Sequence, residues 1–193
     1  MSNPSNYNVA NALTVVRLLL VPIFGWLLLS ADGDTGPLRW WALAVFCVAA
    51  LTDRYDGHLA RRHGLVTVVG AIADPIADKA LTGVALIGLS VLGEVPWWMT
   101  VVILVREWGI TLLRFWVIRH GVISASPGGK LKTVLQMAAI IAFLVPLPAG
   151  LDPVLLAVMG AAVLVTVLTG LDYVARAVAL RRAGALAEPA DRR

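Results

Sequence analysis

The sequence has few charged residues, and this scarcity excludes most classes of soluble protein. Asp, Glu, Lys and Arg make up 15% of the 193 residues, whereas 59% are hydrophobic. A soluble domain carries roughly 25% charged residues. The 16 basic and 12 acidic side chains give a net charge of only +4, which is too small for a nucleic-acid-binding surface. We therefore expect an integral membrane protein that binds no nucleic acid.

Cysteine is nearly absent, and a cleavable leader is not evident. Cys47 is the single cysteine, so the fold can contain no internal disulfide and needs no oxidising compartment. The first ten residues are polar and lack the basic start and the small-residue cleavage site of a signal peptide. We expect residues 1–10 to form a short cytoplasmic segment ahead of the first membrane span.

Long polar linkers and internal repeats are also missing, which favours a single membrane domain over residues 1–193. Apolar runs of bilayer-spanning length, separated by breaks rich in glycine and proline, predict an all-α bundle of six transmembrane helices. The expected spans are 12–30, 38–52, 65–92, 96–118, 133–149 and 153–171. We expect the second helix to continue to about Arg62 and the sixth to about Arg182, which leaves a cytoplasmic tail at about 183–193.

The distribution of Lys and Arg predicts the orientation of the bundle. Basic residues cluster after the second span, after the fourth span and in the tail, at Arg61, Arg62, Arg119, Lys130, Lys132, Arg176, Arg181, Arg182, Arg192 and Arg193. The opposite connections hold one basic residue, Arg39, among the acidic residues Asp32, Asp34, Glu94 and Asp152. Because basic residues concentrate on the cytoplasmic side of a membrane protein, we expect both termini in the cytoplasm.

Four aspartates interrupt the apolar pattern near the cytoplasmic ends of the second and third spans. At ~100° per residue, Asp53 and Asp56 share one helix face, and Asp74 and Asp78 share a stripe on the next helix. A short turn makes these helices antiparallel neighbours, so the two stripes can face each other. Carboxylates that converge repel one another unless a cation neutralises them, and oxygen-only ligands favour Mg²⁺ or Mn²⁺. The four aspartates are therefore candidate ligands for two such ions.

A transporter or proton channel is the alternative from another functional class, because an intramembrane aspartate can also be a proton relay or a packing residue. A relay would need polar residues that continue towards the outer face. Residues 40–51 are uninterrupted apolar, and residues 81–92 offer only Thr82 and Ser90. The polar groups thus gather on one side of the membrane, which favours a catalytic site that faces the cytoplasm.

The acidic stripes belong to a longer pattern, Asp53-x2-Asp56-Gly57-x2-Ala60-Arg61-x8-Gly70-x3-Asp74-x3-Asp78. These eight positions in 26 residues resemble, without a mismatch, the signature of the CDP-alcohol phosphotransferase family. The resemblance implies a six-helix membrane enzyme, usually a homodimer. Such an enzyme moves a substituted phosphoryl group from a CDP-linked donor to an alcohol and releases CMP.

The same resemblance implies roles for the signature residues. Asp53, Asp56 and Asp74 would hold the metal ions, and Asp78 would ligate one of them and act as the base. The residues that would bind the CDP donor are Gly57, Ala60, Arg61 and Gly70. Because no serine or cysteine nucleophile is evident, direct displacement is expected.

Residues outside the signature indicate the acceptor. Over roughly residues 8–137 the chain resembles the phosphatidylglycerophosphate synthases of this family. The matching residues are Asn11, Ala12, Leu13, Thr14, Arg17, Pro22, Lys79, Arg106, Glu107, Arg114, Ala125, Ser126, Gly129, Lys130, Lys132, Thr133 and Gln136. The resemblance implies CDP-diacylglycerol as the donor and sn-glycerol 3-phosphate as the acceptor. Inositol phosphate, or phosphatidylglycerol as in a cardiolipin synthase, are alternative acceptors.

An acceptor that brings its own phosphate dianion needs a basic pocket separate from the metal site. The candidates are Arg106, Arg114, Lys130 and Lys132. Arginine binds phosphate oxygens in a bidentate manner, and the free N–H groups at a helix start also favour an anion. The sixth span and the tail contain no diagnostic motif.

Overall fold

The computed structural model describes residues 9–33, 36–63, 68–117, 127–147 and 150–187. Within its helices, the side chains that lie outside the described part are those of 9–12, 53–63, 68–75, 78, 114–117, 127 and 182–187. The described residues form six helices and no strand, which confirms the all-α prediction. The helices are α1 Val9–Ser30, α2 Pro37–His63, α3 Val68–Val91, α4 Trp97–Val117, α5 Pro127–Leu144 and α6 Asp152–Ala187.

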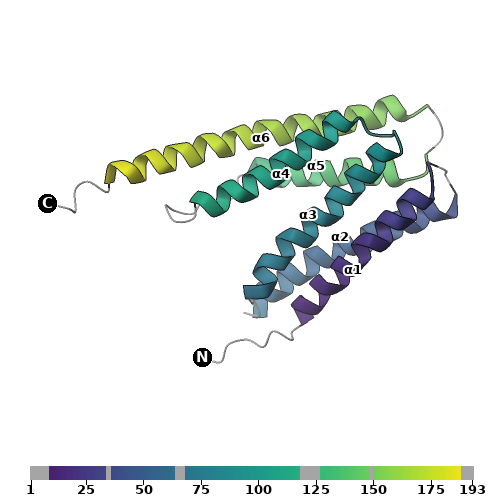
Figure 1. Cartoon of the computed structure of the whole chain (residues 1–193), viewed down its shortest axis with the longest axis horizontal. Coiled ribbons are helices and arrows are strands. Elements are labelled where there is room, and N and C mark those ends of the chain that lie inside the picture. Colours follow the sequence, from purple (N-terminus) through teal and green to yellow (C-terminus); the bar gives the residue numbers. More distant parts are fainter. Residues whose placement is uncertain (1–8, 34–35, 64–67, 118–126, 148–149, 188–193) are drawn as a thin grey trace. The chain divides into compact units, whose positions relative to one another are not determined.

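The chain divides into two compact units, and Figure 1 labels the helices of both. One unit comprises residues 1–96 and 140–152 and therefore contains α1, α2, α3 and the end of α5. The other comprises residues 97–139 and 153–193 and contains α4, most of α5 and α6. The single-domain organisation stays a prediction.

The end of α3 shows how local sequence stops a helix. Gly93 has a φ of 76° and donates its N–H to the Ser90 carbonyl at 3.1 Å. The Glu94 N–H reaches back to the Leu89 carbonyl at 2.9 Å. This pair of bonds is a Schellman motif, which satisfies the last carbonyls of the helix and needs a left-handed residue that glycine adopts at little cost.

Helix α5 differs most from the expected span at 133–149, because it begins earlier and ends earlier. Its first residue is Pro127, and proline is favoured at a helix start because the N–H that it lacks would have no partner there. Pro146 and Pro148 disfavour the helical conformation in the residues before them, so the helix ends at Leu144.

Helix α6 continues past the expected end at about Arg182 to Ala187. The first part of the predicted tail, residues 183–187, is therefore helical. Pro189 follows two residues later, and a proline at this distance is a common helix-stop signal.

In the first unit, α1 packs against both α2 and α3. The approach of α1 to α3 is close at two reciprocal positions. A Cβ atom on Gly25 would lie 2.9 Å from Val84 Cγ1, and one on Gly88 would lie 2.6 Å from Leu28 Cδ2. A Cβ at either point would force the neighbouring side chain to shift, and glycine at such close contacts is typical of helices that pack in membranes.

Arg39, the one basic residue predicted on the outer side, is buried and paired. Its side chain lies in the first turn of α2 and is 5% exposed. Its guanidinium donates two hydrogen bonds to the Glu94 carboxylate, one of them at 2.8 Å, and a third to the Phe143 carbonyl at 2.7 Å. The ion pair and the hydrogen bond to Phe143 thus connect three segments of the chain. Glu94 neutralises the one basic charge that is predicted on the outer side.

The described helices expose much apolar surface. Leu13–Ser30 and Asp152–Arg181 are long and apolar enough to cross a bilayer, and Pro37–Thr52 and Lys79–Val91 are shorter apolar segments. Large apolar side chains along these helices are exposed, among them Trp26 at 65%. A soluble monomer rarely exposes apolar surface on this scale, whereas lipid contact requires it.

Candidate active site

Helices α2 and α3 contain the acidic signature, which falls largely outside the described side chains. Asp53 and Asp56 belong to α2, and Asp74 and Asp78 belong to α3. Their side chains lie outside the described part, as do those of the donor-site candidates Gly57, Ala60, Arg61 and Gly70. The roles of these eight residues stay predictions.

The chemistry of the carboxylates in the signature fits a hard divalent cation. The signature offers four carboxylates, and neither a thiol nor an imidazole is among its fixed positions. Carboxylate oxygens are the ligands that Mg²⁺ and Mn²⁺ prefer. Among the side chains that the structure describes, no group of three or more His, Cys, Asp or Glu could hold a metal ion. The described part therefore offers no competing metal centre.

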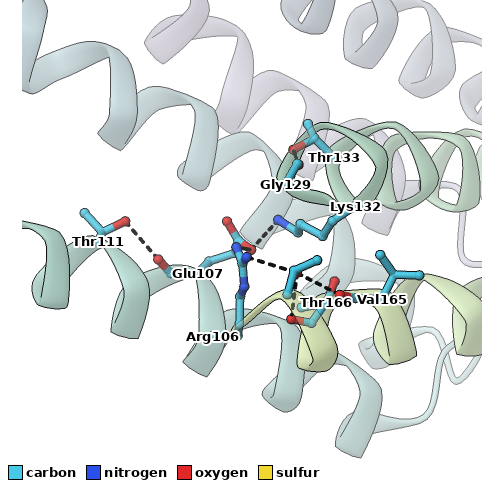
Figure 2. A network of polar contacts seen from close by, with 9 residues as sticks. Arg106, Glu107, Thr111, Gly129, Lys132, Thr133, Val165 and Thr166 are labelled. Carbon is cyan, nitrogen blue, oxygen red and sulfur yellow. Dashed lines mark hydrogen bonds and ion pairs between the residues drawn. The ribbon is translucent and has the colours of Figure 1, made fainter. Parts of the chain in front are cut away.

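A partly buried cluster of charged side chains joins α4 to α5, and two of the predicted phosphate-binding residues belong to it. The Glu107 carboxylate accepts a hydrogen bond from Arg106 Nη1 at 3.1 Å. The same oxygen, Oε1, accepts a second hydrogen bond from Lys132 Nζ. Figure 2 shows the arginine and the lysine converging on this carboxylate from two helices.

The charge and the burial of this cluster favour an anionic ligand. Side-chain exposure is 17% for Arg106, 18% for Glu107 and 6% for Lys132. Buried charges are costly unless they are paired. Arg106 and Lys132 both carry charged N–H donors, which suit the oxygens of an acceptor phosphate.

The first turn of α5 lies at the positive end of the helix dipole, which favours an anion. Lys130 lies in this turn and is exposed, whereas Lys132 is buried. Arg114 belongs to α4, and its side chain lies outside the described part. The structure thus brings Arg106 and Lys132 together and leaves the roles of Lys130 and Arg114 as predictions.

Helix α6 supplies a contact that the sequence did not predict. Arg106 Nη2 donates to Thr169 Oγ1 at 3.2 Å. The Thr169 hydroxyl donates in turn to the Val165 carbonyl at 2.7 Å, within the network of Figure 2. A threonine followed by a glycine in an apolar span is the only sequence signal for this contact, and it is too common to be diagnostic.

Gln136 is a second buried polar residue on this part of α5. It lies one helical turn after Lys132 and therefore on the same face of the helix. Its exposed fraction is 5%, and Oε1 has no hydrogen-bond partner within the described part of the chain. A buried acceptor without a partner requires an explanation, and a ligand hydroxyl is one group that would satisfy it.

The sequence model of the family described as CDP-alcohol phosphatidyltransferase matches residues 7–169, which reach from before α1 into α6. The chain belongs to this family of membrane enzymes, and the resemblance of its signature is thereby confirmed.

Among its relatives, the chain is similar to a probable phosphatidylglycerophosphate synthase of Mycobacterium tuberculosis. The identity is 54% over 183 residues, which cover 95% of this chain and 87% of the relative. A CDP-diacylglycerol–glycerol-3-phosphate 3-phosphatidyltransferase of Bacillus subtilis is 36% identical over 180 residues, 86% of this chain and 93% of the relative. The enzyme of the same name from Escherichia coli is 36% identical over 143 residues, 69% and 75% of the two chains.

Proposed function

We propose that this protein transfers the phosphatidyl group of CDP-diacylglycerol to sn-glycerol 3-phosphate, which gives phosphatidylglycerophosphate and CMP. The observation that supports this acceptor most strongly is the partly buried cluster in which Arg106 and Lys132 converge on Glu107. The printed names of relatives with 54% and 36% identity support the same reaction.

Arg106 and Lys132 bind the phosphate of the acceptor in this proposal. A guanidinium has five N–H donors, so the bonds of Arg106 to Glu107 and Thr169 leave donors for phosphate oxygens. Glu107 holds the two cations near each other before the acceptor binds, because without a shared carboxylate they would repel. Lys130 and Arg114 are proposed to add charge to the same pocket.

On the donor side, Asp53, Asp56, Asp74 and Asp78 are proposed to hold two Mg²⁺ or Mn²⁺ ions. Ions held by these aspartates would neutralise the pyrophosphate of the donor and make its phosphorus more electrophilic. Arg61 would neutralise the same pyrophosphate, and the small residues Gly57, Ala60 and Gly70 would leave room for the CDP moiety. The metal ligands that the signature offers are carboxylate oxygens alone, which supports this assignment.

The reaction needs a base, because a hydroxyl is a weak nucleophile near neutral pH. Asp78 is proposed to take the proton from the free primary hydroxyl of the acceptor. The hydroxyl oxygen then forms a bond to the phosphorus that bears diacylglycerol. The bond from this phosphorus to the oxygen of the CMP phosphate breaks, and its electron pair leaves with CMP. Direct displacement of this kind requires no covalent intermediate on the protein.

We also propose that the six helices cross the cell membrane, that both termini and the active site face the cytoplasm, and that the enzyme is a homodimer. The asymmetric distribution of Lys and Arg supports the orientation. The two long apolar helices and the membrane family to which the chain belongs support the spans.

The test supplies the purified protein with CDP-diacylglycerol and Mg²⁺ and offers one acceptor at a time. We expect CMP release with glycerol 3-phosphate. CMP release with inositol phosphate or with phosphatidylglycerol, but not with glycerol 3-phosphate, would assign a different acceptor to the same family fold. Ion or proton flux in liposomes without any CDP substrate would support the transporter alternative instead.

A further inference from the structure

Arg106 contacts α6 through the hydroxyl of Thr169, whose oxygen is oriented to accept a hydrogen bond. Nη2 of Arg106 lies 3.2 Å from Thr169 Oγ1. The hydroxyl hydrogen of Thr169 is directed to the backbone, 2.7 Å from the Val165 carbonyl and 3.2 Å from the Thr166 carbonyl. Since a hydroxyl has one hydrogen and two lone pairs, Thr169 presents a lone pair to the guanidinium.

The next residue of α6 allows the stem of the same arginine to lie close to the helix. A Cβ atom on Gly170 would lie 3.1 Å from Arg106 Cγ and 3.5 Å from its Nε. A separation of 3.1 Å is tighter than ordinary van der Waals contact between carbon atoms, so an alanine there would displace the arginine stem. Gly170 is buried, as this close approach requires.

We propose that Thr169 and Gly170 are positioning residues for the acceptor phosphate, which they affect through Arg106. This inference rests on the proposed function. Glu107 holds Nη1 and Thr169 holds Nη2, so two helices together determine the plane of the guanidinium. A planar guanidinium binds phosphate well only when its plane matches the positions of the oxygens. Helix α6 thereby contributes to acceptor binding, although its own sequence has no motif for it.

Thr169→Val tests the hydroxyl, because valine keeps the shape of threonine and removes the acceptor. We expect the KM for glycerol 3-phosphate to rise about fivefold, which is less than the loss of a direct hydrogen bond to phosphate would give, because Thr169 acts through Arg106. The KM for CDP-diacylglycerol and kcat should stay near the wild-type values. Thr169→Ser should restore the acceptor KM because it retains the hydroxyl.

Thr166→Val is the matched control for this substitution. Thr166 lies in the same helix and is fully buried, and its hydroxyl has no hydrogen-bond partner within the described part of the chain. The control variant should therefore have the wild-type KM for both substrates.

Gly170→Ala tests the close approach independently of the hydroxyl. Gly160→Ala is its control, because a Cβ at Gly160 would meet no atom within 4 Å. Both substitutions increase helix propensity by the same amount, so a difference between them reports the contact with Arg106. We expect Gly170→Ala alone to raise the KM for glycerol 3-phosphate.

Two results would overturn the inference and leave the proposed function intact. In the first result, the wild type uses glycerol 3-phosphate, and Thr169→Val and Gly170→Ala have the same KM for glycerol 3-phosphate as the wild type. In the other, either variant changes only kcat or the KM for CDP-diacylglycerol. If Thr169→Val fails to fold, the comparison of Gly170→Ala with Gly160→Ala decides alone. A wild type that releases no CMP with glycerol 3-phosphate would instead contradict the proposed function.

Discussion

Glu107 shows how one carboxylate can prepare a site for an anion. It accepts hydrogen bonds from two cations, Arg106 and Lys132, and all three side chains are less than one-fifth exposed. Without Glu107 the two cations would repel each other and separate. The negative charge of Glu107 and its two hydrogen bonds therefore keep Arg106 and Lys132 close together.

Asp78→Asn tests the proposed base. The substitution keeps the size of the side chain and removes its ability to take a proton, so we expect turnover to be lost while binding of CDP-diacylglycerol remains. CMP release measures turnover, and equilibrium binding of the labelled donor measures affinity.

Asp172→Asn is the control for Asp78→Asn. Asp172 is 46% exposed on α6 and forms an ion pair with Arg176, and surface pairs of this kind contribute little to stability. The control should keep wild-type turnover. Normal turnover by Asp78→Asn would show that another group accepts the proton.

The residue scale also shows where sequence reasoning reaches its limit. Arg106 and Lys132 could be predicted because a phosphate needs cations and because they match a family pattern. Thr169 could not, since its contact with Arg106 joins residues 63 positions apart in the chain. A contact of that range depends on helix packing, which local periodicity does not encode.

At the scale of secondary-structure elements, short sequence signals predict where a helix starts and ends better than hydropathy does. The apolar run predicts α5 over 133–149, but Pro127 starts the helix and the later prolines stop it at Leu144. Hydropathy reports which residues lie in lipid, whereas a helix extends as far as its backbone hydrogen bonds permit. Polar residues at the start of α5, among them Lys130 and Lys132, are therefore helical.

Gly88→Ala tests the close packing of α1 against α3. The added Cβ would lie 2.6 Å from Leu28 Cδ2, and Leu28 is fully buried, so the leucine side chain or one of the helices must shift. Overpacking of this kind costs about 1–3 kcal/mol. We expect a lower melting temperature in detergent, measured by thermal unfolding.

Gly160→Ala is again the suitable comparison, because it adds the same methyl group where no atom lies within 4 Å. Its melting temperature should equal or exceed that of the wild type, owing to the higher helix propensity of alanine. Equal melting temperatures for Gly88→Ala and Gly160→Ala would contradict the close contact between α1 and α3.

At the scale of the whole molecule, the charge distribution predicts how the protein lies in the membrane. The pairing of Arg39 with Glu94 removes the only basic charge that opposes this orientation, so the asymmetry is stronger than a count of residues suggests. Composition and charge therefore predict the class of protein and its orientation, and the signature predicts the family. The side-chain arrangement of the acidic site depends on packing that composition does not determine.

Cysteine labelling tests the orientation directly. Cys47 is the single cysteine, so Cys47→Ala provides a background without thiols. In that background, Leu151→Cys should react with a membrane-impermeant maleimide added to intact cells. Ala179→Cys should react only after the membrane is permeabilised. Both positions are exposed, so the reverse pattern would mean that the termini lie outside.

Lys132→Gln tests most directly whether Arg106 and Lys132 select an acceptor that carries a phosphate. Loss of one charged hydrogen bond to phosphate costs about 2 kcal/mol, which corresponds to a rise of about 30-fold in the KM for glycerol 3-phosphate. The KM for CDP-diacylglycerol should not change, and Arg176→Gln, which removes an exposed charge from α6, should leave both values unchanged. An acceptor KM for Lys132→Gln equal to that of Arg176→Gln would contradict the account.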